Sequence, residues 1–173
     1  MNPVPEKLIN FRVYEDGIDY LGVADVELPS IEPMTDAVKG AGIAGEVDAP
    51  VIGQFGSMTL KLNWRTVTRH LVSLAQQKAH SLDLRGAIQT FDSGAGEYVK
   101  TPLKVNVRAI PKKTDLGKLA AASGQDAANE FEVIYIKVTL NGEVLLEIDK
   151  YNYVCVISGT DYLAEVRSAL GLV

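Results

Sequence analysis

Apolar and polar residues alternate with a period of two along most of the chain, which is the pattern of half-buried β-strands. The clearest case is the stretch 129–158, where two β-rich runs flank Asn141-Gly142. Asn-Gly between alternating apolar runs is a strong signal for a β-hairpin. A three-residue loop that begins one residue before Asn141 would set the two apolar rows face to face, with Val138 opposite Val144. We therefore predict a bulged hairpin in that register.

The pattern changes after Asp149, where apolar residues occupy both faces of the predicted strand. Tyr151, Tyr153 and Cys155 alternate there with two valines. Such a strand must be covered on both sides, by its own domain or by another subunit. Cys155 is the only cysteine, so the chain has no internal disulfide, and its β-rich, uncharged surroundings indicate a buried structural thiol.

Other segments complete a mainly β pattern. Alternating runs predict strands at Ile9–Glu15, Ile18–Leu28 (with Tyr20 among its apolar members), Ser57–Thr66, Ser81–Asp92 and Glu97–Lys112, with turns at Asp16-Gly17 and Ser93–Gly96. Helical spacing appears at Val67–Lys78, capped by Thr66 or Thr68, and at Thr160–Leu170, capped by Thr160 and ended by Gly171. We predict a mainly β (α+β) fold, an antiparallel β-barrel or sandwich with a flanking helix and a short C-terminal helix. A chain of 173 residues fits one domain, residues 1–173.

Two segments lack a clear period. Residues 30–56 contain seven glycines and prolines, and residues 113–128 are small and polar, with a possible helical turn at Leu116–Ala122. Long irregular segments inside a compact domain are usually functional. We predict that residues 30–56 form a long assembly loop and that residues 113–128 form a second loop.

Charge is unevenly distributed along the chain, whose net charge is −5. Residues 1–48 carry ten acids and three bases, whereas residues 49–82 carry four bases and no acid. Solvated surface faces explain such a pattern most simply, but complementary patches that guide one copy onto another would also produce it. No basic stripe with interleaved aromatic residues indicates a nucleic-acid-binding surface.

The sequence contains no complete catalytic or cofactor-binding motif. GAGIAG at Gly40–Gly45 matches the letters of the dinucleotide fingerprint, but no strand precedes it and Pro50 follows where a helix is required. His70 and His80 have no metal-ligand partners at suitable spacing, so we interpret both as surface histidines. We predict no catalytic residue, no cofactor and no metal. No apolar run approaches the roughly 20 residues of a membrane span, so no membrane is expected as a partner.

Two long segments resemble a known family. LPSIEPMTDAVKGAGIAGEVDAPVIGQFGSMTLKLNWR (Leu28–Arg65) and VIYIKVTLNGEVLLEIDKYNYVCVISGTDYLAEVRSALGL (Val133–Leu172) resemble the major tail tube proteins of contractile phage tails, the family typified by phage P2. The resemblance implies a β-barrel or sandwich with a flanking helix, whose subunits form hexameric rings that stack into a hollow tube inside a sheath. Contractile bacteriocins use similar tubes and type VI secretion tubes share the fold, and the sequence does not distinguish these systems.

The resemblance also implies partners and a location. The partners are further copies of the chain, the tail sheath protein, a tape-measure protein in the lumen, a baseplate or tube initiator, and DNA as transiting cargo. The location is the virion tail or a phage-tail-like particle, after synthesis in the cytoplasm of the bacterial host.

We assign two sets of residues to assembly. Contacts between rings or subunits are expected at Gly40, Gly42, Ile43, Gly45, Glu46, Val47, Asp48, Val51, Ile52 and Phe55. In stacking, the acids of this loop would pair with bases such as Lys61 or Arg69 of a neighbouring copy. A negatively charged lumen is expected from Glu143, Glu147 and Asp149, which we place together on the polar face of the hairpin.

A second class of function remains open. A monomeric β-barrel that binds a small apolar ligand would also be mainly β, but it would hide its apolar faces internally and need no long glycine-rich loop. An enzyme ranks third, because the sequence contains no convergent polar cluster.

Overall fold

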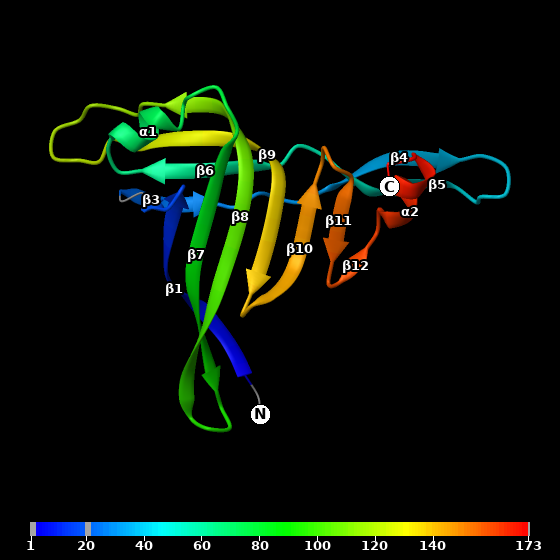
Figure 1. Ribbon diagram of the computed structural model, residues 1–173, viewed down its shortest axis with the longest axis horizontal. Helices are drawn as coiled ribbons and strands as arrows, with labels where there is room; N and C mark the ends of the chain where they lie inside the picture. The colour runs from blue at the N-terminus through cyan, green and yellow to red at the C-terminus, as the bar shows by residue number, and fades with distance from the viewer. Residues whose placement is uncertain (1–2, 20–21, 173) are drawn as a thin grey trace.

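Antiparallel β-strands make up most of the protein, which a computed structural model describes over residues 3–19 and 22–172 (Figure 1). The strands of the described residues are β1 (Pro3–Glu15), β2 (Ile18–Asp19), β3 (Val23–Glu27), β4 (Pro33–Lys39), β5 (Glu46–Phe55), β6 (Thr59–Trp64), β7 (His80–Asp92), β8 (Glu97–Asp115), β9 (Ala127–Leu140), β10 (Glu143–Asp149), β11 (Val154–Ile157) and β12 (Thr160–Asp161). The helices are α1 (Arg69–Ser73) and α2 (Ala164–Ala169). The predicted mainly β class with two short helices is confirmed.

One large sheet forms the body of the molecule. Its strands follow the order β12-β11-β10-β9-β8-β7-β1-β2, and β6 joins β3 to β9. β8 is 19 residues long, and its first part pairs with β7 while its later part pairs with β9. Register shifts in the β8–β9 ladder let these long strands bend, since bulges increase local twist. The bent sheet curls so that the first part of β9 turns to lie alongside β6, its antiparallel partner (Figure 1).

The hydrophobic core lies inside this curl. Its buried members come from β1, β6, β7, β8, β9, β10, β11, the segment around α1 and the residue before α2. The alternation predicted around β6 is confirmed, because Met58, Leu60, Leu62 and Trp64 are at most 1% exposed. The Trp64 indole nitrogen donates a hydrogen bond to the buried Asn129 side chain at 2.8 Å, so the core keeps its polar groups paired there.

Both predicted two-residue turn signals form hairpin turns. Asp16 and Gly17 have φ angles of 50° and 79°, and Asn141 and Gly142 have φ angles of 50° and 80°. Positive φ at both central residues is the geometry of a type I′ turn, which Asn-Gly and Asp-Gly favour.

The predicted register of the β9–β10 hairpin is wrong. Leu140 pairs with Glu143 directly across a two-residue turn, and the ladder shifts further along, between Val144 and Leu146. Val138 therefore faces Leu146. The apolar rows do meet, as expected, but a bulge inside β10 absorbs the extra residue instead of the turn.

The predicted strand with two apolar faces is also wrong. β10 ends at Asp149, whose carboxylate accepts hydrogen bonds from the backbone of Tyr151 and Asn152 and so stabilises a turn. The chain then returns as β11. Tyr151 is exposed in this turn, whereas Cys155 is 1% exposed, as predicted, and burial raises the pKa of its thiol.

The first helix is shorter than the predicted Val67–Lys78. α1 has five residues, and Thr68 caps it by accepting a hydrogen bond from the Leu71 amide, as one of the two predicted caps. Leu71 and Leu74 are fully buried in the core. Beyond Leu74 the chain forms turns that lead to β7.

The second helix begins later than predicted. Thr160 lies in β12, paired with Ile157, and does not cap the helix. The side chain of Asp161 instead accepts a hydrogen bond from the Leu163 amide and binds Arg167. Gly171 follows the helix with a φ of 73°, which fits the predicted helix end.

One of the two histidines departs from its predicted surface position. His80 is 2% exposed, with its two ring nitrogens 2.9 Å from a Glu15 carboxylate oxygen and 3.0 Å from the Gln76 carbonyl oxygen. Its ring also packs edge-on against Phe131. His70, in contrast, is partly exposed on α1.

The N-terminal strands have different bounds from those predicted. β1 begins at Pro3 and not at Ile9. The single strand predicted at Ile18–Leu28 is divided into β2 and β3, and Gly22 before β3 has a φ of 99°. Tyr20 lies outside the described residues.

The second predicted loop is shorter than 113–128. β8 continues to Asp115 and β9 begins at Ala127, so the connection is 116–126, and it contains no helical turn. Gly117 and Gln125 close its base, where the carbonyl oxygen of Gln125 accepts a hydrogen bond from the Lys118 amide at 2.8 Å.

Candidate functional site

The segment predicted as an irregular loop at 30–56 is mostly a β-hairpin. β4 and β5 pair with each other and with no other strand among the described residues, and Val38 faces Val47 across the ladder. We call residues 33–55 the arm. The arm extends away from the main sheet at one end of the long axis of the molecule (Figure 1).

One face of the arm is more apolar than the other. Val38, Val47 and Val51 share one face, on which Asp36 also lies. Glu46 and Asp48 lie on the other face with Ile52, since side chains alternate along a strand. The run Glu-Val-Asp-Ala-Pro-Val in β5 carries this alternation in the sequence. The signal is weak, because the run is short and lies among glycines and prolines.

Most apolar side chains of the arm are exposed. Six of these residues have exposed fractions between 41% and 67%, namely Met34, Val38, Ile43, Val47, Val51 and Ile52. Phe55 is the exception, because it packs against the core at the base of the arm. An isolated two-stranded hairpin is marginally stable in water, so these side chains form a surface suited to a partner.

The three glycines of the rejected dinucleotide motif lie at the tip of the arm. Gly40, Gly42 and Gly45 have φ angles of 127°, 90° and 119°, which side-chain-bearing residues rarely adopt. Open space surrounds each of them. The expectation that no strand precedes the motif is wrong, because β4 ends at Lys39 directly before it, but a strand and not a helix follows. The structure therefore explains these glycines by the shape of a turn.

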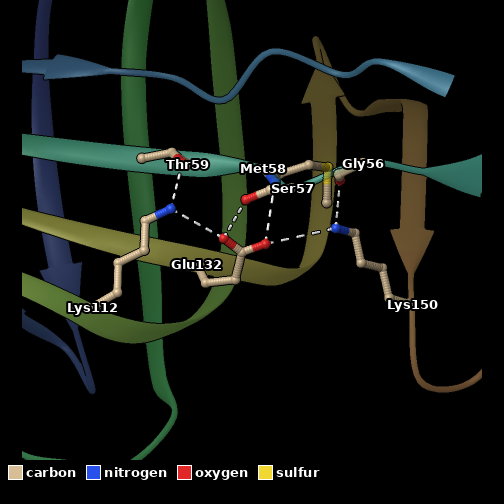
Figure 2. Close-up of polar contacts among 7 residues, drawn as sticks. All are labelled: Gly56, Ser57, Met58, Thr59, Lys112, Glu132 and Lys150. Carbon is tan, nitrogen blue, oxygen red and sulfur yellow. Dashed lines mark hydrogen bonds and ion pairs between the residues drawn. The ribbon is translucent and has the colours of Figure 1, made fainter. Parts of the chain in front are cut away.

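The base of the arm meets a cluster of polar side chains centred on Glu132 of β9 (Figure 2). Its carboxylate accepts hydrogen bonds from the Ser57 hydroxyl at 2.6 Å and from the Met58 amide at 3.3 Å. Lys112 and Lys150 lie 3.2 and 3.8 Å from its oxygens. The sequence contained no local sign of this cluster, because its members come from four separate segments.

A close apolar contact also holds the base of the arm. Gly53 has a φ of 68°, and a Cβ atom placed on it would lie 2.3 Å from a methyl carbon of Leu163. Leu163 is 2% exposed and precedes α2. Glycine is therefore required at this position both by the backbone and by the side chain packed on it.

The predicted acidic row of β10 is only partly assembled. Glu147 faces Lys137 and accepts a hydrogen bond from the Tyr135 hydroxyl at 3.2 Å, and Asp149 lies on the same face. The bulge at Leu145 places Glu143 opposite Leu140, on the other face of the sheet, so the prediction that all three acids share one row is wrong. Burial and the charge of Glu147 raise the pKa of Tyr135.

The polar face that holds Glu147 and Asp149 carries charges of both signs. A shallow concavity of about 830 Å³ on this face is lined by Asp16, Ser81, Leu82, Asp83, Lys104, Asn106, Val107, Arg108, Ile134, Tyr135, Lys137, Asp149, Tyr151 and Asn152. Its bases come from β8 and β9, and its acids come from β7, β10 and the turn after β1. The acids of β10 thus stand beside bases of neighbouring strands.

Exposed bases lie at the end of the molecule opposite the arm, together with acids such as Asp126, which is 3.4 Å from Lys118. α1 and the 116–126 loop lie there (Figure 1), and Arg65, Arg69 and Lys78 are exposed around α1. Residues 65–78 contain no acid. Lys61, the other base expected to meet the arm, lies on β6 and is 3.9 Å from Glu27 of the same chain.

Within residues 3–19 and 22–172, no group of three or more His, Cys, Asp or Glu side chains could hold a metal ion. In the same residues, neither helix is long and apolar enough to cross a membrane.

The chain matches known proteins over nearly its whole length. A family model described as phage tail tube protein FII matches residues 5–171. The tail tube protein of Escherichia phage P2 is 29% identical over 178 residues, which cover 98% of this chain and 99% of that protein. The major tail tube protein of Serratia phage KSP20 is 24% identical over 173 residues, which cover 98% of each.

Solved structures share the fold. The sheath/tube terminator of the PVC extracellular contractile injection system, in the extended state, matches with a TM-score of 0.50 and 18% identity over 79% of this chain and 96% of that one. A chain of the sheath–tube complex of the same system matches with a TM-score of 0.50 and 16% identity over 79% and 90%.

Proposed function

The chain belongs to the phage tail tube protein FII family, and from this premise we propose that it is the self-assembling subunit of the inner tube of a contractile tail. In this proposal hexameric rings stack into a hollow conduit for DNA or ions. The observation that carries self-assembly is the exposed, amphipathic arm, which a lone subunit leaves uncovered. The role of the protein is structural and not enzymatic.

Contacts within a ring are assigned to the open edges of the main sheet. Apart from Tyr14 and Glu15, which pair with β2, β1 has a strand on only one side among the described residues. Exposed apolar residues accumulate on β1 and on the nearby β7–β8 tip, namely Val4, Leu8, Ile9, Tyr98 and Val99. A long open edge of this kind favours pairing with another chain. We assign it to a neighbouring copy, with the hairpins at Asp16-Gly17 and Asn141-Gly142 lining the tube.

Contacts between rings are assigned to the arm. Its acids Asp36, Glu46 and Asp48 lie at one end of the long axis, and the bases Arg65 and Arg69 lie at the other end. Opposite charges at opposite ends favour head-to-tail contacts, and head-to-tail contacts that do not close extend into a stack. The apolar face of the arm would be buried in the same contact.

The arm strands are loosely held in the separate subunit and become ordered on stacking. Ordering a flexible backbone costs roughly 1–2 kcal/mol per residue, and the separate arm buries little apolar surface to offset that cost. Burial of residues such as Val47 and Ile52 against the next ring would supply the free energy that offsets this cost. Subunits would thereby stay separate until a ring offers a template.

The face of the sheet that carries Glu147 and Asp149 is assigned to the lumen. Acids on the wall repel phosphate and let DNA slide, whereas a basic wall would hold DNA at many points. Lys137 locally offsets this charge, because it lies opposite Glu147. The tape-measure protein would occupy the same lumen before DNA does.

Sheath and baseplate partners follow from the same assignment. The solved structures that share the fold include a sheath–tube complex of a contractile injection system, which supports a sheath around this tube as well. A baseplate or tube initiator would supply the first ring. The subunit would be made in the cytoplasm of the bacterial host and would reside in the virion tail or in a phage-tail-like particle.

Negative-stain electron microscopy of the concentrated protein tests this function. Hollow rods with stacked rings are the expected result. Compact particles of one size, at all concentrations and with added tail initiator, would contradict the proposal and favour a monomeric β-barrel that binds a small apolar ligand.

A further inference from the structure

We propose that Glu132 is a positioning residue that holds the arm in one direction relative to the main sheet. The proposal deepens the assembly role of the arm and rests on that proposed function. The geometry that carries it is the polar cluster in Figure 2, which joins the arm's base to three other parts of the chain.

The arm has no β-ladder to the main sheet among the described residues. Its connection to the core on the β5 side is three residues long, because β5 ends at Phe55 and β6 begins at Thr59. Backbone pairing therefore leaves the direction of the arm undetermined. Contacts at the base of the arm must set that direction, namely those of residues 56–58 together with the packing of Gly53 on Leu163 and of Phe55 on the core.

Each residue of this connection has a specific partner. The Gly56 amide donates a hydrogen bond to the Glu32 carbonyl oxygen at 2.9 Å, and the Gly56 carbonyl oxygen accepts one from Lys150 at 2.7 Å. Ser57 and Met58 both donate to Glu132, one to each carboxylate oxygen. The connection is thus fixed on one side by the turn after β10 and on the other side by β9.

Charge makes the carboxylate central to this arrangement. Lys112 and Lys150 both lie within 4 Å of Glu132, so one acid separates two bases. Burial acts to raise the pKa of Glu132, but hydrogen bonds from Ser57 and Lys112 outweigh it and hold that pKa below its ordinary value. A neutral side chain at this position would leave the two ammonium groups facing each other without a carboxylate between them.

The core does not depend on the same contacts. β6 pairs with β9 from Thr59 to Trp64, and Met58 is fully buried beside that ladder. Loss of the Glu132 charge should therefore release the arm's base while β6 stays in the sheet. This separation distinguishes a positioning residue from one that contributes only to general stability.

Distance measurements between spin labels test the proposal in the full chain. Ala37→Cys on the arm and Lys78→Cys at the opposite end carry the labels in a Cys155→Ala background. Glu132→Gln keeps the size of the side chain and removes its charge. Glu130→Gln is the matched control, because Glu130 lies two residues away on the same face of β9. Within the described part of the chain, the Glu130 side chain makes no hydrogen bond to the base of the arm.

The expected result is the same distance distribution in the parent and in Glu130→Gln, with a width set only by motion of the arm's own strands. In Glu132→Gln the distribution should broaden at least twofold. Hydrogen exchange at the Met58 amide should rise by about tenfold, which corresponds to the loss of one charge-assisted hydrogen bond. Exchange in the β6–β9 ladder should stay unchanged, and the yield of tubes should fall.

Several outcomes would overturn the proposal. The first is an equal distribution of label distances in Glu132→Gln and Glu130→Gln. The second is an equal loss of protection from hydrogen exchange in the arm and in the β6–β9 ladder. A distribution as broad in the parent as in Glu132→Gln would also overturn it. Absence of tubes from the parent protein would instead contradict the assembly function alone, because the distance measurement is made on separate subunits.

Discussion

Single glycines determine the shape of the arm tip. Gly42 has a φ of 90° with open space around it, so a substitution there meets backbone strain and no steric clash. Gly42→Val should lower tube yield more than Ala41→Val, because a β-branched residue is poorly tolerated at positive φ. Tube yield by sedimentation at equal protein concentration measures the difference. Equal yields for the two variants would show that the tip conformation is irrelevant to stacking.

Gly53 adds a steric requirement to the backbone requirement. Gly53→Ala should lower the free energy of unfolding by about 2–5 kcal/mol, the sum of left-handed strain and overpacking against Leu163. Gly96→Ala is the control, since Gly96 has a nearly equal φ of 71° in open space. It should cost only about 1–2 kcal/mol. Urea denaturation gives both values, and equal costs would mean that Leu163 moves aside freely.

At the scale of elements, the arm is expected to gain order on assembly. Amides between Gly40 and Phe55 should exchange fast in separate subunits and slowly in tubes, because stacking buries the exposed apolar face of the hairpin. Amides of the β7–β8 ladder near the core provide the internal reference and should be protected in both states. Equal protection of the arm in subunits and tubes would remove its role as an assembly switch.

The attachment of the arm should depend on pH. Because the folded state lowers the pKa of Glu132 from its ordinary value of 4.5, its stabilising contribution is fully present above that value. The contribution is lost as the pH falls through the lowered pKa. The label distances should therefore broaden below about pH 4.5 in the parent. Glu132→Gln should show no such pH dependence, and an identical pH profile in both proteins would assign the change to other carboxyl groups.

At the scale of the whole molecule, the lumen charge should influence passage of DNA. Glu147→Lys should leave tube assembly intact and slow genome ejection, because it places a second base beside Lys137 on the proposed wall. Lys137→Glu on the same pair is the matched reversal and should not slow ejection. The measurement is the rate of DNA release from particles of normal appearance. Unchanged rates with Glu147→Lys would place this face away from the lumen.

Local signals predicted much of the fold correctly. The turn residues Asp16-Gly17 and Asn141-Gly142, the alternation in β6 and the cap at Thr68 act over a few residues, so the sequence carries them directly. The strand in β5 was missed although its polar and apolar residues alternate. Pro50 and the nearby glycines favoured a loop more strongly than six alternating residues favoured a strand.

Long-range pairing accounts for most of the corrections. The bulge at Leu145 depends on which residues of β9 meet β10, and it alone moves Glu143 to the other face of the sheet. His80 is buried because Glu15, which is distant in the sequence, supplies a partner for one ring nitrogen, while the nearby Gln76 carbonyl oxygen lies against the other. No window along the chain contains that information.

The sequence by itself determined the mainly β class, the positions of most turns and the resemblance to tail tube proteins, because periodicity and turn chemistry are local and the family resemblance extends along the chain. Only the tertiary structure decided that residues 33–55 form a paired arm and that Ser57, Lys112 and Lys150 meet at Glu132. The physical reason is that hydrogen bonds and ion pairs form between groups that are close in space. The curl of one long sheet brings these groups together from positions far apart in the chain.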